Sequence, residues 1–270
     1  MPRVIAIANF KGGIGKTTTT INVAAGFALK GAKVLVVDVD AQNNVQMAFG
    51  MPSPRRSLYN VLVENAKVAD CVAPARPNLD VLVAGDSLLM GQTELSRRND
   101  WGRVLEMALK PASRDYDFVF IDCSASVTVL NWNALMAATD IVVPTALEHL
   151  AMQGLSQISR SITRVKGSLT AMRAIVPTMY DTRNRLSNEL LASLRSAHGQ
   201  LVTEPIRVNV RLAEAPAHGK TIYEYDPRSR GAADYAALVE HLGTLFNYRP
   251  APPAPAPEPA AAPAAPLNGF

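Results

Sequence analysis

Short runs of consecutive apolar residues alternate along the chain with longer amphipathic stretches. A run that is apolar at successive positions is typical of a strand that is covered on both faces of a sheet. Such strands are predicted at Val4–Ala8, Val34–Asp38, Leu79–Val83, Phe118–Asp122, Ile141–Pro144 and Arg173–Pro177. Helices are predicted at Thr17–Lys30, Leu88–Leu109, Val127–Ala138, Met152–Lys166, Ser187–His198 and Ala232–Phe246. The alternation predicts an α/β fold, a doubly wound, mostly parallel sheet flanked by helices.

The composition changes abruptly near residue 250. Eight prolines fall within residues 250–266, which excludes a regular helix or a central strand there. We therefore expect residues 1–249 to form one domain and residues 250–270 to form an extended or disordered tail. A spacer tail is favoured over a docking segment.

Bulk composition narrows the class of protein. With 48% hydrophobic and 19% charged residues, the 270-residue chain has a globular balance and the length to bury its own core. Two cysteines, Cys71 and Cys123, are too few for a disulfide framework or a four-thiolate metal site, and they suit a reducing cytoplasm. Neither a secretory signal nor a membrane-spanning stretch is expected.

The strongest chemical signal follows the first predicted strand, where residues 9–18 read N-F-K-G-G-I-G-K-T-T. Glycines between a strand and a helix let backbone N–H groups approach phosphate oxygens, and the helix N-terminus favours the same anion. Lys16 would reach the β- and γ-phosphates, and the Thr17 hydroxyl would ligate Mg²⁺. The predicted ATP-binding residues are Lys11, Gly12, Gly13, Ile14, Gly15, Lys16, Thr17 and Thr18.

Carboxylates stand at the ends of two predicted strands. Because side chains alternate along a strand, Asp38 and Asp40 are expected to point the same way, toward the crevice near the phosphate loop. Asp122 ends an apolar run in a Walker B pattern, and an acid at the end of a buried strand is costly unless it is paired or close to a metal. The predicted Mg²⁺ site consists of Thr17, Asp38, Asp40 and Asp122.

The loop departs from the ordinary phosphate-binding motif, because Phe10 stands where that motif has glycine and a second lysine, Lys11, follows it. The run K-G-G-x-G-K-T-T resembles the deviant Walker A motif of the ParA/MinD group of ATPases. T-M-Y-D at 178–181, N-V-R-L-A-E-A-P at 209–216 and Y-D-P-R-S-R-G-A at 225–232 are similar to segments of the ParA branch. The resemblance covers nearly all of residues 3–246 and implies a Mg²⁺-dependent P-loop ATPase.

The resemblance also implies residue roles. Lys11 would cross the interface of an ATP-dependent homodimer and contact the partner's nucleotide. Asp40 would orient or activate the attacking water, Asp38 would support the Mg²⁺ site, and Asp122 would bind Mg²⁺ through water. The catalytic residues so implied are Lys11, Lys16 and Asp40. Residues 123–126 read C-S-A-S where the family has C-P-P-S, which leaves the sensing of the γ-phosphate open.

Charge is distributed unevenly, since residues 151–200 hold seven Arg and Lys against two acidic residues. Such an excess of positive charge is typical of a surface that contacts the phosphates of a nucleic acid. The resemblance implies that Arg183 and Arg211 contact non-specific double-stranded DNA, for which phosphate contacts suffice. A ParB-like or other adaptor would stimulate hydrolysis and so position a cargo, either chromosome or plasmid DNA or a protein body such as a carboxysome or chemoreceptor cluster. The expected location is cytoplasmic and nucleoid-associated.

Two other classes stay open at this point. A MinD-like membrane-associated positioning ATPase needs a C-terminal amphipathic helix with a basic face, whereas residues 250–270 contain no Lys or Arg. We therefore expect no membrane partner. A metabolic or chaperone ATPase with the same loop would need neither the basic 151–200 region nor Arg211.

Overall fold

A seven-stranded sheet, with the order β3-β4-β2-β5-β1-β6-β7, runs through the computed structural model. The structure describes residues 2–148 and 151–249, so the expected tail at 250–270 lies outside the described residues. All neighbouring strands are parallel except the antiparallel pair β3–β4. The strands are β1 (Arg3–Ile7), β2 (Val34–Asp38), β3 (Ala73–Arg76), β4 (Leu79–Leu82), β5 (Phe118–Asp122), β6 (Asp140–Ala146) and β7 (Met172–Thr178).

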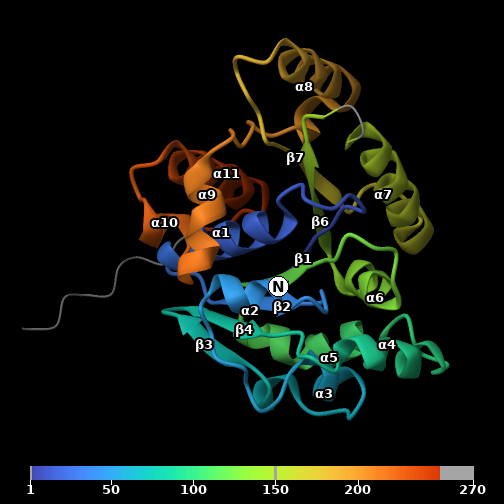
Figure 1. Cartoon of the computed structure of the whole chain (residues 1–270). Helices are drawn as coiled ribbons and strands as arrows, with labels where there is room; N and C mark the ends of the chain where they lie inside the picture. Colours follow the sequence, from blue (N-terminus) through green and yellow to red (C-terminus); the bar gives the residue numbers. More distant parts are fainter. Residues whose placement is uncertain (1, 149–150, 250–270) are drawn as a thin grey trace, which may run out of the picture.

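Helices cover both faces of this sheet, which confirms the predicted doubly wound architecture (Figure 1). One face carries α1, α2, α10 and α11, and the other carries α3 to α8. The α-helices are α1 (Lys16–Leu29), α2 (Asn44–Ala48), α3 (Leu58–Leu62), α4 (Leu88–Ser96), α5 (Val104–Ala112), α6 (Val129–Ala137), α7 (Ala151–Lys166), α8 (Arg185–His198), α9 (Val210–Glu214), α10 (Ile222–Tyr225) and α11 (Arg230–Leu245). The 3-10 turns are η1 (Val68–Asp70), η2 (Ser113–Asp115), η3 (Gly199–Leu201) and η4 (Ala215–His218).

Burial on both faces explains why the central strands are apolar at every position. In β2, Leu35 and Val37 pack into the core under α3 to α8, while Val34 and Val36 pack into the core under α1 and α11. A polar side chain on either face of such a strand would lose its hydration. The consecutive apolar runs of the sequence therefore mark these strands to within two residues at each end.

The predicted single helix Leu88–Leu109 is wrong, because the structure divides it into α4 and α5. Between them Trp101 packs on the ring of Trp132, with ring centroids 5.8 Å apart. A Cβ on Gly102 would lie 3.0 Å from the Trp132 indole nitrogen, so the chain passes close to this ring. The buried Asn133 amide donates to the Trp101 carbonyl and accepts from the Leu105 N–H. These tertiary contacts hold the break.

The sequence patterns did not predict the edge strand β3 or the short helices α2, α3, α9 and α10. The residues of β3 are half-buried or exposed and include Pro74, so they form no apolar run. Each of the four helices has four or five residues, which is too short to show helical periodicity.

Candidate active site

The phosphate loop joins β1 to α1 at the carboxyl end of the sheet. Gly13 and Gly15 have φ of +71° and +83°, a left-handed conformation that side chains disfavour, and Gly15 directly precedes α1. The loop forms one wall of a cavity of about 710 Å³ that is lined by residues 12–18. All predicted ATP-binding residues from Gly12 to Thr18 thus face one space.

Lys16 is buried, and its ammonium donates a hydrogen bond of 2.8 Å to the Lys11 carbonyl oxygen. Burial lowers the pKa of Lys16, and the Asp122 carboxylate opposes that shift most strongly. The Lys11 side chain is half-buried, and its Cβ lies 3.3 Å from where a Cβ on Gly154 of α7 would stand. Lys11 and Lys16 therefore meet at the start of the loop.

Asp122 lies under the first turns of α1 and accepts two hydroxyl hydrogen bonds. Thr17 Oγ1 and Thr20 Oγ1 each donate to one of its oxygens at 2.7 Å. Burial raises the pKa of Asp122 to about 6, against the opposing effect of the two hydroxyl donors. Thr20 was missed as a site residue. The run of four threonines at 17–20 could have indicated it, because Thr17 and Thr20 are three residues apart and therefore share one face of the helix.

Asp38 and Asp40 differ in their surroundings more than strand alternation suggested. Asp40 lines the cavity, whereas the fully buried Asp38 carboxylate accepts the N–H groups of Asp40 at 3.0 Å and Val45 at 3.3 Å. Asp38 lies beside Asp122 in the register of β2 and β5. Burial and the Asp122 charge raise the pKa of Asp38 well above its ordinary value. Asp38 thus fixes the turn into α2 next to the site.

The far wall of the cavity comes from segments distant in the sequence. Asn44 and Met47 of α2 face Pro216 and Ala217 of η4, and Met179 follows β7. A Cβ on Gly219 would stand 2.8 Å from Gly50 Cα, so the segment after η4 packs tightly on the end of α2. Residues 124–126, the departure after Walker B, also line the cavity. The sequence indicated the phosphate side of this space but not its opposite wall.

Comparisons with known proteins now decide the family. Residues 2–174 match the model of an AAA domain. The chain is 37% identical over 249 residues to sporulation initiation inhibitor protein Soj of Bacillus subtilis, covering 90% of this chain and 98% of that protein. It is 39% identical to chromosome partitioning protein ParA of Caulobacter vibrioides, covering 89% and 93%. A solved cobyrinic acid a,c-diamide synthase from Mycobacterium smegmatis, with bound ATP analogue and magnesium, superimposes with a TM-score of 0.79 at 28% identity, covering 93% and 99%.

The chain belongs to the ParA/Soj family of ATPases. The predicted family and activity are confirmed, and the MinD-like alternative has less support. In residues 2–148 and 151–249, no helix is both long enough and apolar enough to cross a membrane.

The residues around the cavity suit a magnesium nucleotide in this ParA-family ATPase. Left-handed glycines leave room for phosphate beside backbone N–H groups, and the Lys16 ammonium supplies a positive charge. The Thr17 hydroxyl and the Asp122 and Asp40 carboxylates are oxygen ligands of the kind that Mg²⁺ prefers. A bound Mg²⁺ would neutralise phosphate charge and would remove the cost of burying Asp122 in its ionised form.

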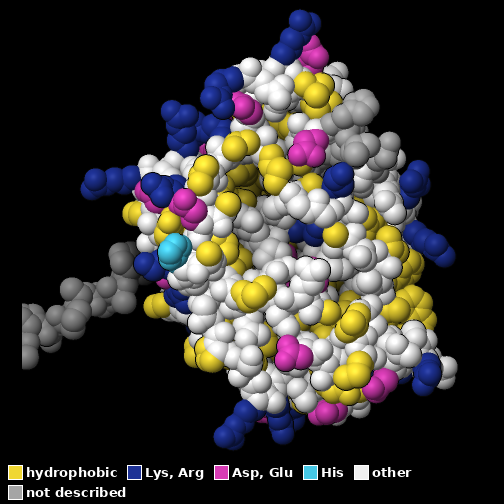
Figure 2. Space-filling model, viewed as in Figure 1, with side chains coloured by type: hydrophobic (Ala, Val, Ile, Leu, Met, Phe, Trp, Pro, Cys, Tyr) yellow, Lys and Arg dark blue, Asp and Glu magenta, His cyan; other side chains and the backbone are white. Residues whose placement is uncertain are grey.

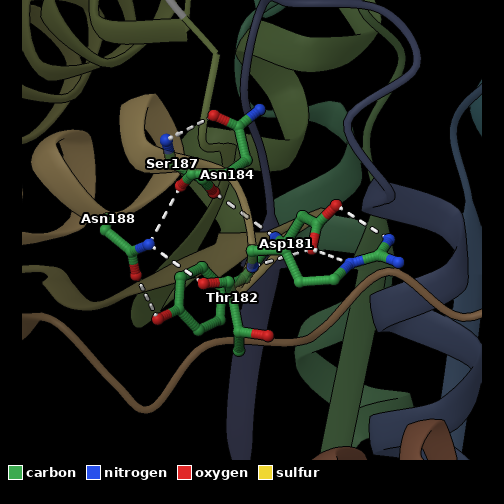
Figure 3. A network of polar contacts seen from close by, with 7 residues as sticks. Asp181, Thr182, Asn184, Ser187 and Asn188 are labelled. Carbon is green, nitrogen blue, oxygen red and sulfur yellow. Dashed lines mark hydrogen bonds and ion pairs between the residues drawn. The ribbon is translucent and has the colours of Figure 1, made fainter.

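The loop after β7 presents Arg183 at the surface. Its side chain is 88% exposed, and Nε and Nη2 donate to the two Asp181 oxygens at 3.1 and 3.2 Å. Figure 3 shows how the loop is fixed: the Asn184 side chain accepts the Ser187 N–H, and the Asn188 amide donates to the Thr182 carbonyl. The loop is therefore a defined platform for a surface arginine.

Arg211 lies on α9, one helical turn before η4. Nη1 donates to Glu214 at 2.8 Å, Nε lies 3.5 Å from Asp226, and the arginine side chain is 53% exposed. Figure 2 shows Lys and Arg side chains along the upper and left rim of this face, over α8 and α9, around a central hollow. The structure thus places both predicted DNA-binding arginines at the surface, each already beside a carboxylate.

Proposed function

We propose that this ATPase forms an ATP-dependent homodimer that binds non-specific double-stranded DNA, and that a partner protein stimulates hydrolysis to release the DNA. The observation that carries the proposal is structural continuity. The segments that hold Arg183 and Arg211 also contribute Met179, Pro216 and Ala217 to the wall of the nucleotide cavity. A change of nucleotide can therefore act on both arginines.

The residues of the cavity suit phosphoryl transfer to water. Lys16 would hold the β- and γ-phosphates, while Thr17 and Asp122 would hold the metal. Asp40, which lines the cavity, would orient the water that attacks the γ-phosphate. Lys11 reaches the nucleotide of the second subunit, as the family resemblance implies. Asp38, buried and bonded to two backbone N–H groups, keeps Asp40 in place and supports the metal site.

Phosphate contacts account for DNA binding without base recognition. Two exposed guanidinium groups, one on the loop after β7 and one on α9, can each donate to backbone phosphates, and this contribution carries no sequence preference. The name of one relative, chromosome partitioning protein ParA, favours a chromosome as cargo over a protein body. The adaptor is then ParB-like, and the protein acts on the nucleoid.

We also infer that residues 1–249 are the ATPase domain and residues 250–270 a spacer.

The test measures binding of a fluorescent, random-sequence DNA duplex by anisotropy, with a non-hydrolysable ATP analogue. Arg183→Ala and Arg211→Ala should each weaken binding and lower the steepness of its salt dependence by about one phosphate contact. Arg103→Ala is the matched control, because Arg103 is also exposed and also paired with a glutamate three residues on. Equal losses for all three variants, or none for the first two, would contradict the proposed DNA surface.

A further inference from the structure

We propose that Glu214, assisted by Asp226, is a built-in competitor of DNA that holds Arg211 and keeps DNA affinity low. This inference rests on the proposed function and adds a regulatory element to it. The Arg211 guanidinium, which is proposed to bind DNA phosphate, already contacts two carboxylates, those of Glu214 and Asp226. Neither carboxylate has so far been given a role.

A second residue, Tyr225, holds the Glu214 carboxylate beside Arg211. The Glu214 Oε2 atom accepts from Arg211 Nη1 at 2.8 Å and from the Tyr225 hydroxyl at 3.0 Å. The His218 ring stacks on Tyr225 with ring centroids 5.1 Å apart. These hydrogen bonds, from Arg211 first and Tyr225 second, hold the pKa of Glu214 below its ordinary value. An ordinary solvated i,i+3 pair does not need such a support.

The pairing geometry resembles phosphate recognition. A carboxylate and a phosphate each offer acceptor oxygens to the N–H groups at the edge of a guanidinium, so they compete for the same donors. Asp226 adds a second negative charge 3.5 Å from Arg211 Nε, from the loop that leads to α11. A DNA phosphate must displace or share these contacts before Arg211 contributes fully to affinity.

The competitor is connected to the nucleotide cavity. Glu214 ends α9, and the next turn, η4, places Pro216 and Ala217 in the cavity wall. Gly219, which follows η4, has φ of +62°, and its carbonyl oxygen accepts a hydrogen bond from Arg76 Nη2 at 2.7 Å. A shift of this wall therefore acts on α9, which carries both Glu214 and Arg211, and gives the nucleotide a route to the strength of this competition.

The experiment compares the full-length wild-type chain with Glu214→Gln, using the random-sequence duplex and a non-hydrolysable ATP analogue. Glutamine keeps an oxygen that accepts from Tyr225 but loses the charge. We expect about threefold to fivefold tighter DNA binding, the size of effect typical of one exposed ion pair. In an Arg211→Ala background the same substitution should gain little, because the guanidinium that it releases is gone.

Glu106→Gln is the matched control, since Glu106 pairs with Arg103 at i,i+3 and 2.8 Å, and the substitution changes the net charge equally. Equal tightening by both glutamate variants would show a net-charge effect and overturn the proposal. Unchanged or weaker binding by Glu214→Gln, while Arg211→Ala still weakens binding, would overturn the competitor but leave the proposed function standing. An Arg211→Ala variant that binds like the wild type would overturn both.

Discussion

Asp122→Asn should make the metal-free protein more stable at pH 8 while abolishing hydrolysis. Asp122 is fully buried at the end of β5, and burial raises its pKa from its ordinary value of 3.8 to about 6. In the absence of Mg²⁺ its charge is therefore a cost in the folded state at neutral pH. Asparagine keeps the shape, an acceptor for one threonine hydroxyl and a donor for the other, but carries no charge.

The size of the gain follows from that shift. About two pKa units correspond to about 3 kcal/mol between the charged and neutral forms. That pKa already includes the favourable charge interaction with Lys16, and imperfect replacement of the two hydroxyl hydrogen bonds by the asparagine amide reduces the gain. We therefore expect a net gain of about 1–2 kcal/mol, or roughly 3–6 °C in Tm for a domain of this size.

The pH dependence of the Tm difference between Asp122→Asn and the wild type tests whether the buried charge of Asp122 destabilises the folded protein. Because the folded-state pKa of Asp122 is raised, its stability contribution is fully present below about pH 4 and is lost as pH rises through about 6. The Tm difference between Asp122→Asn and the wild type should be small near pH 4, should widen from pH 4 to 6, and should stay constant above. Thermal unfolding in EDTA, followed by circular dichroism, measures this difference.

Asp140→Asn is the matched control. Asp140 begins β6, the strand that pairs with β1 on the side opposite β5. Asp140 is also buried, but it is paired with Arg3 at 3.0 Å and with Arg173 at 3.6 Å, so removing its charge leaves these arginines without their partner. This variant should lose stability at pH 8. A lower Tm for Asp122→Asn at pH 8 in EDTA, or a gap that does not depend on pH, would refute the reasoning about the buried charge.

Two further predictions concern close backbone approaches. Gly26→Ala should cost about 1–3 kcal/mol in urea unfolding, because its Cβ would lie 2.6 Å from Val239 Cγ2 between α1 and α11; unchanged stability would contradict the tight packing of these helices. Gly219→Ala should weaken nucleotide affinity in isothermal titration, because its Cβ would lie 2.8 Å from Gly50 Cα at a φ of +62°. Wild-type affinity would show that the wall formed by η4 is not part of the nucleotide site.

The sequence predicted those parts of the fold that depend on local pattern. Consecutive apolar residues marked the strands buried on both faces, such as β2 and β5, and the glycine-lysine loop marked the phosphate side of the cavity. The break between α4 and α5 was not predictable, because contacts of Trp132 and Asn133 with residues 101–105 produce it. No local pattern encodes a contact that only the folded chain brings together.

The site shows the same limit. Strand alternation predicted that Asp38 and Asp40 point the same way. Instead, the Asp38 carboxylate accepts hydrogen bonds from two backbone N–H groups and points toward the first turn of α2. The wall formed by Pro216 and Ala217 is about 200 residues from the phosphate loop in the sequence and follows from topology. The contacts of Arg211 with Glu214 and Asp226 could not be predicted, because the sequence pattern did not reveal α9.

The central claim is that ATP, and not ADP, makes this protein bind DNA. Asp40→Ala removes the carboxylate that we propose orients the attacking water, so the variant should keep ATP intact while DNA binding is measured. The most direct measurement is a gel shift of random-sequence duplex DNA with this variant in ATP, in ADP and without nucleotide. The account predicts retention of DNA in ATP alone. Equal binding in all three conditions, or none in any, would contradict it.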